Sequence, residues 1–193
     1  LGNQMFQYAF VRGLAHHKMF DWVIPGPNAD RLDNYGLFEA FELYGCKPEN
    51  QGEPFFAKQK VYRDMKFNKE IWDWAEDNTN FSGNFQTELY FEGISADIKH
   101  DFTFKKEYLE PCQEYINSIG GQDNNLFLHV RRGNPNVTGR RGEKWSYQMV
   151  QEYHPICKKE YYIEALKQFD ENKNVIVVSD TIDWCKKQDW LQG

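Results

Sequence analysis

The most regular pattern of hydrophobic and polar positions lies toward the C-terminal end of the chain. Two apolar runs of strand length, residues 126–131 and 175–179, flank a pattern over residues 158–170 in which apolar side chains recur every three or four positions. That spacing is typical of a helix with one buried face. Two nearly continuous apolar strands on either side of such a helix predict a βαβ unit, with both strands buried in a parallel sheet.

The first part of the chain is less regular. Phe6, Phe10 and Leu14 share one helical face directly after Gly2-Asn3, and Asn3 is the expected N-cap of that helix. The other expected elements are two short strands, at residues 22–24 and 81–86, and two helices, at residues 69–76 and 108–119. Strands that alternate with helices along the chain indicate an α/β fold.

Residues 120–125, Gly-Gly-Gln-Asp-Asn-Asn, form the clearest linker, because Gly and Asn favour turns. We therefore predict a first α/β domain over residues 1–119 and the start of a second domain over residues 120–193. The chain begins at Leu1 and ends at Gly193, directly after a helical pattern. We expect it to be a fragment of a longer protein, so its sequence does not define the targeting of the intact protein.

The strand at residues 126–131 ends in two arginines and a glycine. Because side chains alternate along a strand, His129 and Arg131 are expected on one face and Arg132 on the other. The carboxyl ends of strands are where open α/β sheets bind ligands, and Asp180 ends the neighbouring strand at the same edge. A guanidinium group can donate two parallel hydrogen bonds to a phosphate. The pattern predicts an anion site; the alternative is that the arginines form surface ion pairs.

Composition limits the kind of partner. The net charge is −6 and the sequence pI is about 5.4, so no overall basic field favours a nucleic acid. An anionic ligand must therefore be bound by a local cluster of cations. The four cysteines form no C-x-x-C pair and no zinc-binding spacing, and we interpret them as reduced thiols. No apolar stretch is long enough to span a membrane.

Four segments, in this order, resemble motifs of glycosyltransferase family 11, the α-1,2-fucosyltransferases. They are Leu1-Gly-Asn-Gln-Met-Phe-Gln-Tyr-Ala9; Gly83-Asn-Phe-Gln86 with Tyr90-Phe91; His129-Val-Arg-Arg-Gly133 with Tyr153-His-Pro155 and Tyr161-Tyr162; and Val178-Ser-Asp180 with Asp183-Trp-Cys-Lys-Lys187. The resemblance implies a GT-B-like fold of Rossmann-type parallel sheets flanked by helices, with an incomplete nucleotide-sugar-binding domain over residues 120–193.

The resemblance also implies an activity. It is the inverting transfer of L-fucose from GDP-L-fucose to the 2-hydroxyl of a β-galactoside, with no metal and no other cofactor. The expected partners are the donor and a galactoside-containing glycan, in the cytoplasm or at the membrane periphery, and no nucleic acid. Two alternatives stay open: a non-catalytic relative that binds a GDP-sugar or a glycan, and a transferase that uses another GDP-sugar.

The resemblance assigns donor-site roles to several residues. Arg131 is the expected catalytic residue, which would stabilise the departing diphosphate, and Arg132 would assist it or form a structural ion pair behind the strand. His129 resembles the family histidine at the nucleotide site; the alternative is a core histidine. Asp180 resembles the acid that binds the guanine or its ribose. The alternative is that Asp180 is the N-cap of the following helix, with Asp183 at its third position, and both roles can coexist.

Gly2 and Asn3 open a helix, where backbone N–H groups suit an anion or a sugar; the alternative is a plain N-cap. Asn134 stands where the family usually has an aspartate, which motivates the non-catalytic alternative. The family's Ser-Phe-Ser-Trp-Trp-Gly segment, expected beyond residue 193, is missing. A polar loop is expected after the arginines, at residues 133–155. It contains Glu143, Glu152 and His154, which are candidates for the acceptor base or, as the alternative, solvated surface residues, and the base is left unassigned. His16 and His17 are interpreted as surface or structural residues.

Overall fold

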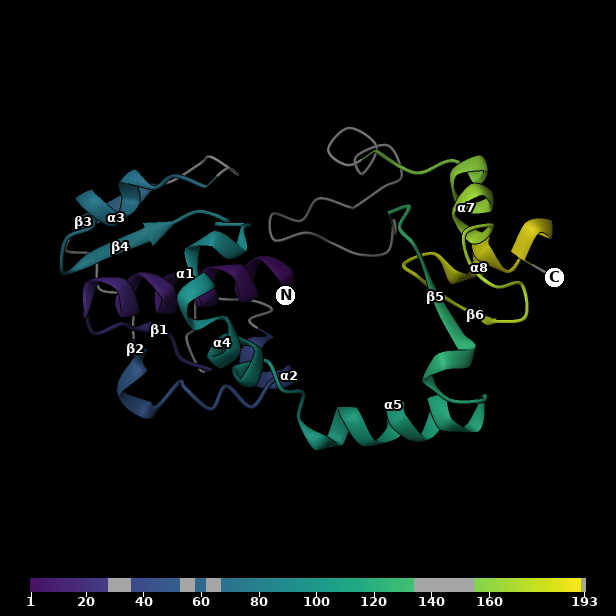
Figure 1. Ribbon diagram of the computed structural model, residues 1–193, viewed down its shortest axis with the longest axis horizontal. Coiled ribbons are helices and arrows are strands. Elements are labelled where there is room, and N and C mark those ends of the chain that lie inside the picture. The colour runs from purple at the N-terminus through teal and green to yellow at the C-terminus, as the bar shows by residue number, and fades with distance from the viewer. Residues whose placement is uncertain (28–35, 53–57, 62–66, 134–154, 192–193) are drawn as a thin grey trace. The chain divides into compact units, whose positions relative to one another are not determined.

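The computed structural model describes residues 1–27, 36–52, 58–61, 67–133 and 155–191 (Figure 1). The chain forms two compact units, Leu1–Leu109 and Glu110–Gly193. The division falls inside helix α5 (Lys106–Ser118), before the linker at which we predicted the domain boundary. The polar loop expected after the arginines lies mostly outside the described residues, and so do Asn134 and the candidate bases Glu143, Glu152 and His154.

Unit 1 is built around the long helix α1 (Gly2–Lys18). Leu1 is its N-cap, so the prediction that Asn3 caps the helix is wrong; Asn3 lies inside the first turn. The helix ends where Met19 adopts a left-handed conformation, with φ 55°, and its N–H bonds to the Ala15 carbonyl. Phe10 and Leu14 are buried, as the apolar face predicted.

Short elements surround α1. The strands form two parallel pairs, β1 (Ile24–Pro25) with β2 (Gln51–Gly52) and β3 (Lys58–Val61) with β4 (Thr79–Ser82). The helices are α2 (Leu37–Ala40), η1 (Pro48–Asn50), α3 (Glu70–Trp74), η2 (Glu88–Tyr90), η3 (Glu92–Ile94) and α4 (Ser95–Asp101). Figure 1 shows α1 between the β3–β4 pair and the β1–β2 pair. The strand predicted at residues 22–24 overlaps β1 at Ile24, and the strand and its exit predicted at residues 81–86 overlap β4 at Phe81 and Ser82.

Two apolar clusters lie against α1. Tyr8 and Ala9 belong to the cluster that includes Ile24, whereas Phe10 and Leu14 belong to the cluster that includes Ile71. Because one helix supplies buried side chains to both clusters, the packing of α1 holds unit 1 together.

A buried charged group lies beside the first cluster. Asp101 is 2% exposed and accepts hydrogen bonds from the Tyr8 hydroxyl (2.8 Å) and the Gly45 amide (2.7 Å), and it forms an ion pair with Arg12. A buried carboxylate is stable only when such partners satisfy it. These bonds to Asp101 connect α1 to the end of α4 and to the loop at Gly45. Nothing in the sequence pattern indicated them.

Unit 2 contains the predicted βαβ arrangement. Its elements are α5, η4 (Gln122–Asn124), β5 (Asn125–Val130), α7 (Lys159–Leu166), β6 (Asn174–Ser179), α8 (Ile182–Cys185) and η5 (Asp189–Leu191). Strands β5 and β6 pair in parallel from Asn125↔Asn174 to Val130↔Ser179, which confirms the predicted pairing.

The two faces of the β5–β6 sheet differ. Leu128 and Val130 are buried against Tyr162 of α7 and Cys185 of α8. On the opposite face Phe127 is 60% exposed and Val178 is 50% exposed. The prediction that both strands are buried on both faces is therefore wrong for the described residues, because the helices that pack on the pair cover one face. No helix in the described part of the chain is long and apolar enough to cross a membrane.

The thiols are also as expected: Cys46, Cys112, Cys157 and Cys185 are all free. Cys112 and Cys157 are exposed. Cys46 packs against the first cluster of unit 1, and burial raises the pKa of its thiol to about 11. Because the thiolate is the reactive form, a raised pKa makes Cys46 a poor nucleophile at neutral pH.

Close packing of α1 generates the first prediction. A Cβ atom at Gly13 would overlap the Tyr90 carbonyl oxygen, whereas a Cβ atom at Gly93 would meet nothing within 4 Å. Gly13→Ala should lower the free energy of unfolding by about 1–3 kcal/mol, because the added methyl group overpacks this contact. In an open helix the same substitution normally raises the free energy of unfolding. Thermal or urea unfolding measures this, with Gly93→Ala as the matched control. Equal stability of the two variants would contradict the close approach.

The second prediction concerns Cys46. At pH 8 iodoacetamide should modify the exposed Cys112 well before Cys46, as followed by mass spectrometry of the digested protein. The Cys46 rate should rise about tenfold per pH unit between pH 7.5 and 9.5, because the thiolate fraction rises in that proportion below the pKa. A rate that levels off below pH 9 would show that burial does not control this thiol.

Candidate functional site

The end of β5 carries the residues of the predicted anion site. His129 and Arg131 are exposed on the open face of the sheet, whereas Leu128 and Val130 point to the covered face, as the alternation predicted. Arg131 makes no hydrogen bond or ion pair with any other residue that the structure describes. Its guanidinium lies at the carboxyl end of the parallel pair, where ligands bind in such sheets.

Arg132 lies on the opposite side of the strand from Arg131. Its guanidinium carbon is 3.7 Å from the ring centroid of Trp184 in α8. A cation over an indole face is attracted by the ring quadrupole. This contact packs Arg132 against α8; the structural ion pair expected as its alternative stays a prediction. A direct role for Arg132 at the donor stays a prediction.

Asp180 follows the last residue of β6 and is turned toward β5. Its Oδ1 accepts the Arg132 amide at 2.9 Å and its Oδ2 accepts the Gly133 amide at 2.8 Å. The alternative that Asp180 caps the next helix is wrong, because Thr181 is the N-cap of α8. The predicted placement of Asp180 and Arg131 at one edge is confirmed by the register, in which Val130 pairs with Ser179.

The glycine that ends the arginine motif is held in a special conformation. Gly133 is buried and has φ 89°, a region that side-chain-bearing residues rarely adopt. The motif Arg131-Arg132-Gly133 is therefore a turn fixed at its far end by a glycine, and its two later amides are satisfied by Asp180.

Gly2 and Asn3 lie in unit 1 and so belong to a different unit from the arginines. Gly2 is exposed and has open space around it. The Asn3 Oδ1 atom accepts a hydrogen bond from the Gln86 side chain at 2.6 Å, and the Gln7 side chain donates to the Gly83 carbonyl at 2.7 Å. The first two motif segments of the resemblance are thus bonded to each other.

The turn that carries Gln86 is held from within the core. Phe85 has φ 49°, which is unusual for an aromatic residue, and is 2% exposed. Its ring stacks on Phe10 of α1, with centroids 3.7 Å apart and planes at 4°. Burial of this ring offsets the backbone strain, and the arrangement presents Gln86 to the first turn of α1.

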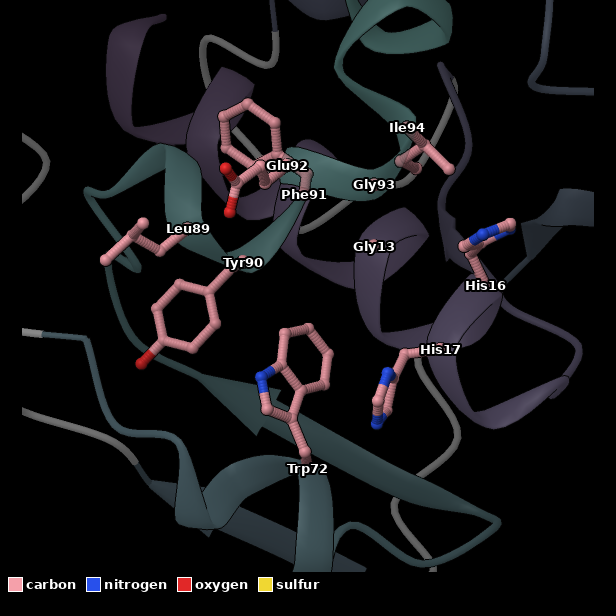
Figure 2. A pocket seen from close by; sticks show the side chains of 10 residues that line it. All are labelled: Gly13, His16, His17, Trp72, Leu89, Tyr90, Phe91, Glu92, Gly93 and Ile94. Atoms are coloured by element: carbon pink, nitrogen blue, oxygen red, sulfur yellow. The ribbon is translucent and has the colours of Figure 1, made fainter.

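Unit 1 also contains a pocket of about 220 Å³ that the sequence did not indicate (Figure 2). It is lined by Gly13, His16, His17, Trp72, Leu89, Tyr90, Phe91, Glu92, Gly93 and Ile94. The His17 and Trp72 ring centroids are 4.6 Å apart. His16 and His17 are exposed, so their expected surface placement is confirmed, but both also line this pocket.

No group of three or more His, Cys, Asp or Glu side chains that could hold a metal occurs among the residues that the structure describes. Metal-independent chemistry stays a prediction from the resemblance.

Two comparisons with known proteins show the family of this chain. The family model for glycosyl transferase family 11 matches residues 54–189, which include the arginine motif and Asp180. The chain is also 23% identical over 210 residues to an alpha-1,2-colitosyltransferase of Escherichia coli, an alignment that covers 97% of this chain and 68% of that protein. None of the solved structures matches the chain significantly. Because the family match spans more than half of the sequence, the chain belongs to glycosyl transferase family 11.

Proposed function

We propose that this chain transfers L-fucose from GDP-L-fucose to the 2-hydroxyl of a β-galactoside, with inversion at the anomeric carbon. Membership of family 11 makes the chain a glycosyltransferase, and the family and the related colitosyltransferase support a GDP-sugar donor. The observation that carries the proposal is Arg131, an exposed cation at the carboxyl end of a parallel strand pair, with His129 on the same face.

The chemistry of the departing group explains the need for Arg131. When the bond between fucose and GDP breaks, negative charge develops on the oxygens of the terminal phosphate. In the proposed reaction the Arg131 guanidinium donates two parallel hydrogen bonds to those oxygens. A donor of this kind acts on charge that grows in the transition state, so it accelerates the reaction as well as binding the product.

The remaining predicted residues lie in two units, and each is described within its own unit. In unit 2, His129 shares the open face with Arg131 and can donate to or accept from the nucleotide. In unit 1, Gly2 is exposed at the start of α1 and has open space beside the helix amides, which supports its predicted role in binding a ligand group. We also propose that the two units correspond to the Rossmann-type domains of a GT-B transferase, which the parallel strand pairs in each unit support.

A second candidate donor follows from the relative's name. Colitose is L-fucose without its 3-hydroxyl, so the two GDP-sugars share the diphosphate that Arg131 would bind. The relative is a colitosyltransferase, which favours a GDP-colitose donor as the alternative. Initial rates with GDP-L-fucose and GDP-L-colitose separate the two, because a site that bonds to the 3-hydroxyl rejects the deoxy sugar.

Removal of the Arg131 charge tests the proposed function. Arg131→Ala should lower kcat for lactose-dependent GDP release from GDP-L-fucose by about 10²- to 10³-fold. It should also weaken GDP binding, because a charge-assisted hydrogen bond contributes about 1.5–3 kcal/mol. Lys159→Ala is the matched control, since Lys159 is an exposed cation on α7, the helix that packs on the other face of the sheet.

Three results would decide between the proposals. Lactose-dependent release that Arg131→Ala slows by about 10²- to 10³-fold, with Lys159→Ala unaffected, is the expected result. GDP binding without release for any β-galactoside would favour the non-catalytic alternative. A full chain that neither binds GDP nor releases it would contradict the proposed function.

A further inference from the structure

The carboxylate of Asp180 joins the ends of the two paired strands of unit 2. The β5–β6 ladder ends at Val130↔Ser179, so the amides of Arg132 and Gly133 lie beyond the last strand pair. Each of these amides donates to a different oxygen of Asp180, at 2.9 and 2.8 Å. The Asp180 side chain therefore links the end of β6 to the two residues that follow Arg131, beyond the last backbone pair of the ladder.

This contact constrains the backbone that carries Arg131. On its N-terminal side Arg131 follows Val130, which is fully buried in the sheet. On its C-terminal side the next two amides are held by Asp180, and the turn closes at Gly133 with φ 89°. The Arg132 guanidinium is held over Trp184. Arg131 is thus the exposed residue of a turn whose other members are all fixed.

The Asp180 carboxylate keeps acceptor capacity beyond these two bonds. An ionised carboxylate has two lone pairs on each oxygen, and each Asp180 oxygen accepts one backbone amide. The contact with the Arg131–Gly133 turn is therefore compatible with the base-binding role that the resemblance assigns to Asp180.

We propose that Asp180 is a positioning residue, which fixes the Arg131–Gly133 turn so that Arg131 meets the diphosphate. The inference rests on the proposed function only in naming the diphosphate as the ligand of Arg131. The fixed turn lowers the conformational entropy that Arg131 would otherwise lose when it binds an anion.

The first test compares two ligands, GDP and inorganic pyrophosphate, which has no base. In the full chain, Asp180→Asn removes the charge and one of the two acceptors while keeping the shape. It should weaken the binding of pyrophosphate about tenfold, a shift of about 1.4 kcal/mol, and the binding of GDP by at least that factor. Asp183→Asn, an exposed acid in the first turn of α8, is the control and should change neither. Weakened GDP binding with unchanged pyrophosphate binding would overturn the proposal.

A double-mutant cycle tests whether Asp180 acts through Arg131. In an Arg131→Ala background, Asp180→Asn should have little further effect on pyrophosphate affinity, because the residue that it positions is gone. Two independent contributions would add instead. Additive losses would therefore contradict a positioning role.

Amide hydrogen exchange tests the contact without any ligand, and so separates its failure from that of the proposed function. In the wild-type chain the amides of Arg132 and Gly133 should exchange slowly although they lie beyond the strand end, and Asp180→Asn should speed their exchange about tenfold or more. If the chain binds neither GDP nor pyrophosphate, the proposed function fails while slow exchange still supports the positioning contact. Fast exchange of these two amides in the wild-type chain would overturn the inference, even if the variant does not fold.

Discussion

The parallel pairing of β5 with β6 determines where the charged residues of unit 2 can lie. Its register brings Val130 opposite Ser179, so the residues that follow each strand meet at one edge. Alternation then separates Arg131, on the open face, from Arg132, which packs over Trp184 on the side of the helices. Asp180 joins the two strand ends through the backbone. The cation that we assign to the diphosphate is therefore placed by the ladder.

Unit 1 depends on a comparable constraint at α1. One helix supplies buried residues to both apolar clusters and passes so close to Tyr90 that no side chain fits at Gly13. The same helix bonds through Asn3 to Gln86, in a turn whose Phe85 ring is anchored in the core. The motif at the start of α1 and the motif around Gln86 are thus bonded to each other, and packing of the Phe85 ring holds the strained backbone of that residue in place.

The sequence predicted those features that depend on local periodicity. The strand and helix patterns of unit 2 gave the β5–β6 pairing and the opposite facing of Arg131 and Arg132, because alternation is a property of the strand alone. It did not predict the partner of Asn3, since Gln86 is 83 residues away. Nor did it indicate that backbone amides bind Asp180, because every residue type except proline offers the same N–H group.

The central claim is that Arg131 binds the diphosphate of the donor nucleotide while Arg132 stays with Trp184. The most direct measurement is an NMR titration of the full chain with GDP that follows the side-chain Nε–H signals of the two arginines. We predict a saturable shift of the Arg131 signal, with the Arg132 signal little changed. If GDP binds, moves signals elsewhere and leaves that of Arg131 in place, the account of this site is contradicted.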